Sequence, residues 1–247
     1  MGERLGYMRG SFGRGVAAVL ARVHERGGDV RTARPVRIVR RTTDGRFEVT
    51  AGGGTETFDL VLSTVAIPEL LRIAADLPEE TRKSWSAVRY THALCPILQL
   101  DRPFHPYYWT NIADVTMPFG GVIEHTNYIP RERYGGRHIL YISDYILPDD
   151  PKWTMRDEQL WGMYLPGLAR INPCFEGNWI LAKTIERGEF AQPIVPANYS
   201  RLLPPIETPV PGLYSACMAQ IYPEDRGQNY AVRIGRQAAE LLIEKHA

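Results

Sequence analysis

The end of the chain, residues 212–242, restricts the fold more than any other segment. Its sequence is GLYSACMAQIYPEDRGQNYAVRIGRQAAELL, which starts as an apolar strand, passes through a polar turn at 222–229 and ends as an amphipathic helix. Apolar residues repeat along one face of that helix, as in a helix that packs on a core. They are Ala231, Ile234, Ala238, Leu241 and Leu242. The segment therefore predicts a strand, a turn and a helix in direct succession.

The polar turn before this helix has the residues of a binding loop. Asp225 and Gln228 have the spacing of a capping box. The turn at 226–229 would present unpaired backbone N–H groups at a helix N-terminus, which attract anions and carbonyl oxygens. Gly227 would let a ligand approach the backbone, and Gly235 would let the helix pack tightly against a strand. Two interpretations remain: a cradle for a phosphate or for the polar edge of a flavin, or a well-capped helix without a ligand.

The N-terminal part has the pattern of one helix followed by a meander of strands. A helix is predicted at 13–26, where one stripe holds Val16, Val19, Leu20 and Val23. Strands are predicted at 29–31, 36–40, 46–50 and 58–64, with turns at Asp44-Gly45 and at 52–54. The run DLVLST (59–64) is apolar without alternation, which is typical of a strand buried on both faces.

After Pro68 the chain becomes rich in proline and aromatic residues. Strands of a second sheet are predicted within 93–104 and 137–147, and a helix within 154–171 that Thr154 or Asp157 could cap. A proline-rich connection then leads back to the closing strand and helix. We therefore expect an α/β (α+β mixed) fold in which a domain built from 1–66 and 205–247 is interrupted by a mixed-sheet domain at 67–204.

Composition excludes several classes of protein. A net charge of +1 over 247 residues argues against nucleic acid as a partner, because phosphate binding needs a basic surplus. No apolar run in the sequence reaches the ~20 residues that cross a bilayer. Cys95, Cys174 and Cys217 have no metal-binding or redox spacing. They predict reduced thiols in a cytoplasmic protein.

The aromatic-rich block contains candidate substrate-pocket residues in GGVIEHTNYIP. These are Glu124, His125 and Asn127, with Tyr108 nearby in the sequence. A histidine beside a carboxylate can serve acid–base chemistry. In a strand, however, Glu124 and His125 would point to opposite faces. A structural histidine near a loop is the alternative interpretation.

Both ends of the chain resemble the flavin-dependent amine oxidase superfamily, which includes protoporphyrinogen oxidases, phytoene desaturases and, more distantly, UDP-galactopyranose mutase. Residues 10–70, from GSFGRG to VAIPEL, are similar to its helix, strand, hairpin and "D.Vi.T.P" strand. Residues 212–242 are similar to its closing motif, "GLY.aGD…GA..SG..AA..i", and FAQPIVPANYSRL (190–202) resembles the strand before that motif. The resemblance is vague between about 85 and 180.

The resemblance implies an FAD-dependent oxidoreductase that passes hydride from a small organic substrate to the flavin. It implies that Val36 lends backbone groups to the adenine and that the strand ending at Thr64 runs near the cofactor. Flavin contacts are implied at Asp225, Arg226, Gly227, Gln228, Asn229 and Ala231. Cys217 and Met218 stand where the superfamily often has Gly-Asp, so Glu224 or Asp225 would have to replace the carboxylate near Met218.

The superfamily's N-terminal G-x-G-x-x-G unit has no counterpart in the sequence. The glycines at 10–15 have the wrong order and open a helix without a preceding strand. The chain is therefore interpreted as the C-terminal part of the enzyme. It would need a separate dinucleotide-binding chain or a missing N-terminal domain, and would bind FAD weakly alone.

Two alternatives remain. One is a UDP-galactopyranose-mutase-like flavoenzyme that would grip a pyrophosphate with Arg131, Arg133 and Arg137. The other is a non-catalytic fragment that needs a partner.

Overall fold

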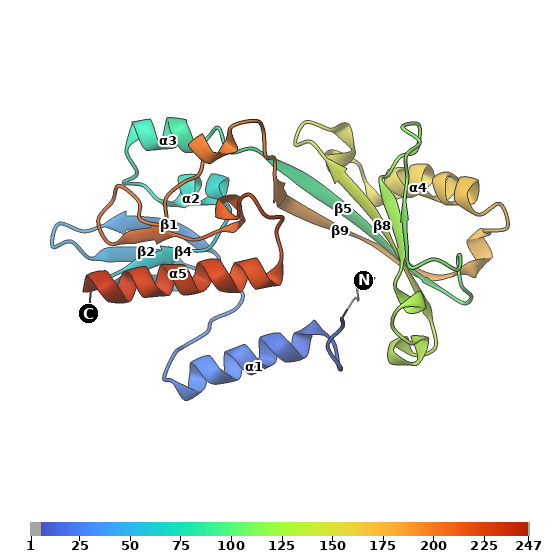
Figure 1. Cartoon of the computed structure of the whole chain (residues 1–247), viewed down its shortest axis with the longest axis horizontal. Helices are drawn as coiled ribbons and strands as arrows, with labels where there is room; N and C mark the ends of the chain where they lie inside the picture. Colours follow the sequence, from blue (N-terminus) through green and yellow to red (C-terminus); the bar gives the residue numbers. More distant parts are fainter. Residues whose placement is uncertain (1–5, 247) are drawn as a thin grey trace. The chain divides into compact units, whose positions relative to one another are not determined.

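The structure is a computed structural model that describes residues 6–246. The chain forms two compact units, which are described separately. Figure 1 labels helices and strands of both units. The first holds the residues up to Leu60 together with 72–76, and the second holds Val61–Leu71 and the residues from Leu77 onward. Residues 1–5 of the first predicted domain segment lie outside the described residues. The predicted domain boundaries at 67 and 204 stay a prediction.

The first unit contains one helix and a three-stranded antiparallel sheet of order β1-β2-β3. Its elements are α1 (Phe12–Glu25), β1 (Val36–Arg41), β2 (Phe47–Ala51) and β3 (Gly54–Phe58). The predicted hairpin turn is present, because Gly45 has φ +90° and Thr42 N donates to Arg46 O at 2.8 Å. Val39 and Phe47 are the buried apolar residues of β1 and β2.

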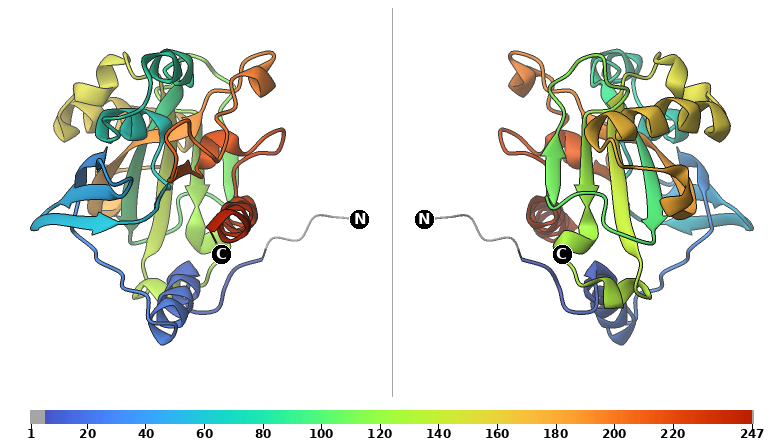
Figure 2. Two further views of the ribbon diagram at one scale, coloured as in Figure 1. Left: turned by 90° about the vertical axis from the view of Figure 1, so that its left-hand side faces the viewer. Right: turned by 90° about the vertical axis from the view of Figure 1, so that its right-hand side faces the viewer.

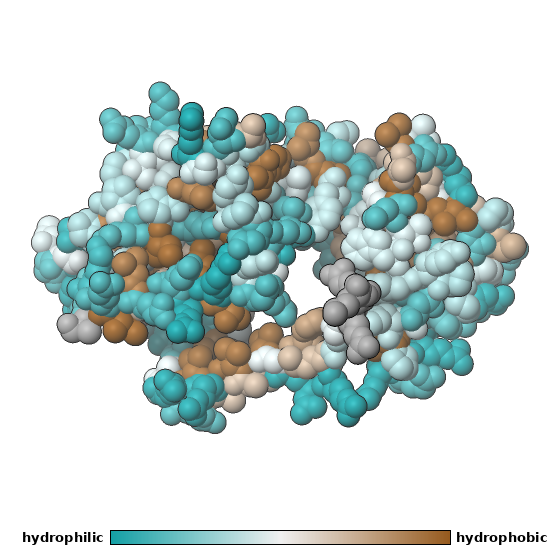
Figure 3. Space-filling view, in the orientation of Figure 1, coloured by the Kyte–Doolittle hydropathy of each residue, from teal (hydrophilic) through white to brown (hydrophobic). Residues whose placement is uncertain are grey.

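Helix α1 confirms the predicted stripe, yet none of its described residues is buried. Val16 is 57% exposed and Val19 is 64% exposed, with Leu20 and Val23 also exposed. Hydrophobic side chains therefore gather on the surface of α1, at the bottom of Figure 3. The 3.6-residue period identified the apolar face correctly but could not show whether anything packs on it.

The strand pattern differs from the prediction in two places. Residues 29–31 form no strand, and the predicted strand at 58–64 is replaced by β3 and by the short β4 (Val61–Ser63). The glycines explain part of the difference, because Gly53 and Gly54 have φ of +116° and +146° and let the chain turn tightly into β3. Every residue of β3 is exposed, so the strand carries no alternating pattern.

The second unit contains a small parallel sheet that joins distant parts of the chain. Strand β10 (Leu213–Ser215) pairs with β4 in parallel, with Ser215 opposite Ser63. Helix α5 (Gln228–His246) packs its Ile234 and Ala238 against Ala216 after β10. The helices α2 (Ile67–Ile73) and α3 (Glu79–Trp85) follow β4. The predicted strand–turn–helix succession at the chain's end is thus confirmed.

A five-stranded antiparallel sheet forms the larger part of the second unit, with order β6-β7-β8-β5-β9. The strands are β5 (Tyr90–Leu100), β6 (Trp109–Asn111), β7 (Gly121–Glu124), β8 (His138–Ile146) and β9 (Ile180–Pro193). Helix α4 (Asp157–Ile171) crosses one face of this sheet (Figure 2). Leu94, Leu98 and Leu140 of that face form a core with Leu160 and Tyr164 of α4. The strands and the helix predicted here are confirmed.

A buried polar group lies within this core. Asp144 of β8 is 5% exposed and accepts hydrogen bonds from Lys152 Nζ at 2.6 Å and from the Tyr164 hydroxyl at 2.8 Å. Lys152 Nζ also donates to Pro118 O at 3.1 Å. Burial and the neighbouring Asp144 raise the pKa of Tyr164 far above its usual value. The group ties α4 and the segment before it to the sheet.

Candidate functional site

The other face of the five-stranded sheet, which we call the outer face, carries aromatic and small apolar side chains. Tyr141 and Tyr145 of β8 lie on it, and their cross-strand neighbours on β5 are Ile97 and Ala93. These positions alternate with the buried ones, because side chains along a strand point to opposite faces. Tyr145 is 49% exposed. The outer face is therefore a half-exposed aromatic surface.

His125 lies on this outer face. It begins the short 3-10 helix η1 (His125–Asn127), and its ring packs edge-to-face against those of Tyr141 and Tyr134, at 5.8 and 5.2 Å between centroids. His125 Nε2 also contacts the Tyr134 hydroxyl at 2.5 Å. Burial lowers the pKa of His125. The histidine is therefore kept neutral in an aromatic setting.

The polar turn before α5 is attached to the outer face through Arg226. The guanidinium donates to Gln192 Oε1 of β9 at 2.5 Å and to the Tyr145 hydroxyl of β8, and it lies over the Tyr145 ring at 5.4 Å. Cation–π contact and hydrogen bonding act together here, as the planar guanidinium allows. The turn that the sequence singled out is thus held beside the aromatic surface.

The start of α5 has the open backbone groups that a helix N-terminus provides. The first α-helical bond runs from Ala231 N to Gly227 O at 2.9 Å, so the amides before Ala231 have no acceptor inside the helix. The predicted capping box is wrong: Asp225 Oδ1 accepts from the adjacent Arg226 N at 2.8 Å, and no hydrogen bond joins Asp225 and Gln228 in the described part of the chain.

Glu224 is paired with α5. Its carboxylate accepts two hydrogen bonds of 2.8 Å from Arg233, which lower the pKa of Glu224 to about 2. Arg233 therefore offsets the negative charge of Glu224 close to the start of the helix.

A pair of unpartnered hydroxyls lies at the carboxyl ends of the parallel strands. Ser63 and Ser215 face each other across β4 and β10, and both Oγ atoms are buried without a hydrogen-bond partner among residues 6–246. Thr64 is exposed directly after β4, and Met218 is 38% exposed shortly after β10. Ligands of parallel sheets bind at this edge. The unsatisfied hydroxyls fit a polar ligand such as a flavin.

The remaining predicted residues are distributed as follows. Val36 lies at the start of β1 in the first unit, and Ala231 is exposed on α5. Glu124 and Asn127 contact the loop after β5, and Tyr108 O accepts a hydrogen bond from Glu124 N at 2.8 Å. Their assignment to a substrate pocket stays a prediction.

Sequence reasoning missed several residues of the site. Gln192 and Tyr145 lie 34 and 81 positions from Arg226, so local spacing gave no signal for either. Gln220 was also missed: its side chain donates to Ser215 O at 2.8 Å and accepts from Cys217 N at 2.6 Å, which fixes the segment after β10. Gly235 was misread, because an added Cβ would meet no atom within 4 Å in the described chain.

The second unit thus contains a parallel strand pair, a helix whose first backbone amides are unpaired, and an antiparallel sheet with an aromatic outer face. Comparison with protein families gives a direct assignment. The family described as flavin containing amine oxidoreductase matches residues 2–243, so the chain belongs to this family. The family-level prediction made from the two chain ends is confirmed.

Solved structures share the fold at low sequence identity. A protein provisionally named a protoporphyrinogen oxidase, from Exiguobacterium sp., superposes with a TM-score of 0.73 at 16% identity, over 93% of this chain and 51% of its own. Putrescine oxidase bound to putrescine has a TM-score of 0.64 at 17% identity, over 95% and 53%. Reduced UDP-galactopyranose mutase has a TM-score of 0.55 at 16% identity, over 72% and 39%.

The chain thus spans about half the length of the first two of these structures. No curated protein is significantly similar in sequence. Within residues 6–246, the helices are all too short or too polar to cross a membrane.

Proposed function

We propose that this chain supplies the flavin-ring edge and the substrate-binding surface of an FAD-dependent oxidoreductase. In that reaction a small organic substrate gives up hydride. The observation that supports the proposal is Arg226, which joins the turn before α5 to Tyr145 and Gln192 of the outer sheet face. A cofactor held at the turn would therefore lie within reach of a substrate on that face.

The residues that would hold FAD lie at three places. The backbone amides of Gly227–Asn229 would bind the polar edge of the flavin ring, because they are the unpaired donors at the start of α5. The hydroxyls of Ser63 and Ser215 would bind a further polar group at the strand ends. The resemblance adds Val36 for the adenine, and Thr64 and Met218 along the cofactor. When bound, the flavin accepts the hydride, and the protein binds and orients the reactants.

The outer face would bind the substrate. Tyr141 and Tyr145 offer an apolar body with a polar tip, and His125 between Tyr134 and Tyr141 stays neutral near pH 7 because burial lowers its pKa. A neutral imidazole can take up a proton from the substrate as hydride leaves.

The partner in this proposal is a dinucleotide-binding unit with a glycine-rich phosphate turn, supplied by another chain or domain. The structural relatives are about twice as long as this chain. The exposed apolar stripe of α1, with Val16 and Val19, fits a surface that packs against further protein. A location in the cytoplasm stays a prediction.

The test is a titration with FAD, followed by flavin absorbance and by quenching of flavin fluorescence. The chain alone should bind FAD weakly, and adding an N-terminal βαβ unit should restore tight binding and yellow colour. Gly227→Ile should abolish that binding, because the side chain would fill the approach to the backbone and displace Asn229, whose Oδ1 lies 2.7 Å from the added Cβ.

Gly235→Ile is the matched control on the same helix, since an added Cβ there would meet no atom of the described chain within 4 Å. Tight FAD binding by the isolated chain would contradict the need for a partner. A restored complex that keeps its flavin after Gly227→Ile would contradict the role of the turn.

The mutase alternative receives less support from the arginines. Arg131 contacts His138 at 3.5 Å and Arg137 contacts Gln99, so these two are engaged by protein groups. It stays a prediction.

A further inference from the structure

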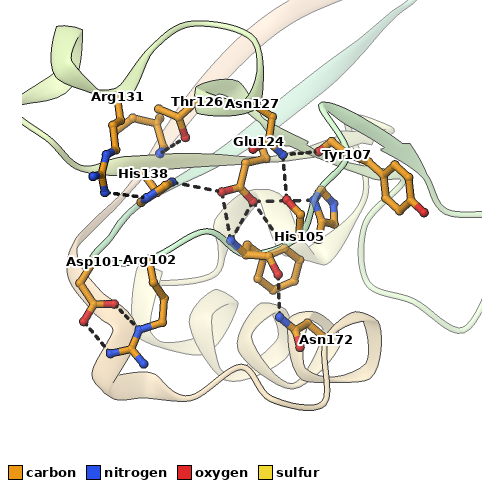
Figure 4. Close-up of polar contacts among 12 residues, drawn as sticks. Asp101, Arg102, His105, Tyr107, Glu124, Thr126, Asn127, Arg131, His138 and Asn172 are labelled. Atoms are coloured by element: carbon orange, nitrogen blue, oxygen red, sulfur yellow. Dashed lines mark hydrogen bonds and ion pairs between the residues drawn. The ribbon is translucent and has the colours of Figure 1, made fainter.

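A buried carboxylate at the end of the five-stranded sheet holds the loop that follows β5. Glu124, the last residue of β7, is 0% exposed. Its oxygens accept from Phe104 N at 3.0 and 2.9 Å and from His105 N at 3.0 Å (Figure 4). Asn127 Nδ2 donates to the carbonyls of His105 and Tyr107 at 2.7 and 3.0 Å. Glu124 therefore binds N–H groups of residues 104–107, and Asn127 binds carbonyl groups of the same loop.

Two imidazoles flank this carboxylate. His105 Nδ1 lies 3.7 Å from one oxygen of Glu124, and His138 Nδ1 lies 3.8 Å from the other. Both Nδ1 atoms are buried and have no hydrogen-bond partner among residues 6–246. A buried polar atom without a partner is rare in native proteins and calls for a physical explanation. A proton moving within the cluster would supply one.

The outer contacts of the two rings differ, and this fixes one tautomer. His138 Nε2 faces Arg131 Nη1 at 3.5 Å, and because a guanidinium can only donate, Nε2 must accept and the ring proton sits on Nδ1, towards Glu124. His105 Nε2 faces Thr110 Oγ1 at 3.1 Å, and a hydroxyl can donate or accept. His105 Nδ1 can therefore accept a proton from Glu124, while His138 can only donate one towards it.

Burial disfavours the charged form of each of the three groups. Burial raises the pKa of Glu124 and lowers those of His105 and His138. Two charged groups on neighbouring elements also act on His138: Arg131 lowers its pKa and Asp101 raises it. Asp101 is itself bound by the adjacent Arg102 at 2.8 Å.

We propose that Glu124, His105 and His138 form a proton-binding latch for the 104–107 loop. One proton shared by Glu124 and an imidazole keeps the cluster neutral as a whole, either as a neutral acid with two neutral rings or as a carboxylate beside one imidazolium. Loss of that proton leaves a buried carboxylate without a counter-charge. Its desolvation cost outweighs the gain from its N–H bonds to Phe104 and His105, and the loop loosens. The loop lines a surface cleft with Thr110, Ile171 and Asn172, so the latch would make the shape of that cleft depend on pH.

The signs of the pH dependence follow from the directions of the shifts. A raised pKa at Glu124 contributes stability that is present below its ordinary value of 4.5 and is lost as pH rises through the folded pKa. The lowered pKa values of His105 and His138 contribute stability that is present above 6.5 and is lost as pH falls through their folded values. Rising pH should therefore weaken the latch through Glu124, and falling pH should weaken it through His105 and His138.

The test is amide hydrogen exchange at Phe104 and His105, whose N–H groups donate to Glu124, in the full chain from about pH 5 to about pH 8. After correction for the intrinsic exchange rate, protection in the wild type should fall on the alkaline side by up to about tenfold per pH unit. Glu124→Gln keeps an acceptor oxygen and cannot ionise. In this variant the loss of amide protection at rising pH should disappear, while the loss of protection at falling pH should remain. Glu189→Gln, an exposed substitution on β9, should behave as the wild type.

If amide protection falls equally with rising pH in Glu124→Gln and in the wild type, the latch is overturned. A wild-type profile that is flat after correction also overturns it. A second measurement does not depend on the folding of any variant: the ring nitrogen shifts of the wild type should show His138 as the Nδ1–H tautomer near neutral pH. Finding the Nε2–H tautomer at His138 would contradict the proposed proton arrangement.

Discussion

Replacing Gly167 with alanine should leave the stability of the second unit unchanged or lower it, whereas the same replacement at Gly162 on the same helix should raise it. An alanine Cβ at Gly167 would lie 2.8 Å from Phe119 Cε1 and 3.2 Å from two carbons of Pro118. Phe119 is 4% exposed, so its ring cannot move into solvent. At Gly162 the same Cβ meets no atom of residues 6–246 within 4 Å. The two positions therefore differ in packing and share the helix.

The magnitude follows from two opposing effects. Alanine in place of glycine inside a helix gains about 1 kcal/mol at either position. Overpacking a well-filled core costs about 1–3 kcal/mol, and it acts at Gly167 alone. Gly162→Ala should thus gain about 1 kcal/mol, and Gly167→Ala should range from no change to a loss of about 2 kcal/mol.

Urea unfolding monitored by tryptophan fluorescence would measure the difference, because Trp161 of α4 lies in this core at 6% exposure. The urea concentration at the unfolding midpoint should be higher for Gly162→Ala than for the wild type. For Gly167→Ala it should be equal to or lower than that of the wild type. The dependence of the unfolding free energy on urea concentration should be the same in all three proteins. Equal shifts in the same direction for both variants would refute the packing of α4 on Phe119.

Three further predictions concern single contacts. Lys152→Met leaves the buried carboxylate of Asp144 with the Tyr164 hydroxyl but without its cation. The free energy of unfolding, measured by urea unfolding, should fall by about 3 kcal/mol. A loss below about 1 kcal/mol would contradict a tight pair. Glu224 has a pKa lowered to about 2 by Arg233, so its contribution is present above its ordinary value of 4.5 and is lost as pH falls to about 2. Glu224→Gln should flatten this acid loss in a pH series of thermal unfolding, and an unchanged acid limb would show that the pair contributes nothing. Gly235→Ala should raise stability by about 1 kcal/mol because the site is open, and a lower melting temperature would contradict that open space.

Periodicity predicted the elements well wherever a single face is buried. The alternation of β5 and the stripe of α4 gave their positions, because a core on one side imposes a regular pattern. Strand β3 escaped notice because all its residues are exposed, and an exposed strand has no apolar alternation. The stripe of α1 was predicted and is present, but a sequence pattern cannot show whether an apolar face has a covering partner.

The candidate site was predictable only in its local part. The turn at 226–229 is one continuous segment with unusual residues, so its position at the start of α5 could be predicted from spacing. The contacts of Arg226 with Tyr145 and Gln192 bring three distant segments together, and no spacing rule encodes such contacts. The capping box failed for a related reason: Asp225 had a nearer donor in the amide of the next residue.

Strand β8 shows how one short segment can serve two separate tasks. Tyr141 and Tyr145 lie on the outer face, where the proposed substrate would bind, beside Ile97 and Ala93 of β5. His138 begins the same strand on the face that α4 covers, and His138 Nδ1 lies 3.8 Å from Glu124. Neighbouring side chains along a strand point to opposite faces. The proton latch and the substrate surface therefore share the backbone of β8, while their side chains lie on opposite faces of the sheet. A substitution at Glu124 should therefore change the pH dependence of the 104–107 loop and leave flavin binding at the turn before α5 unchanged.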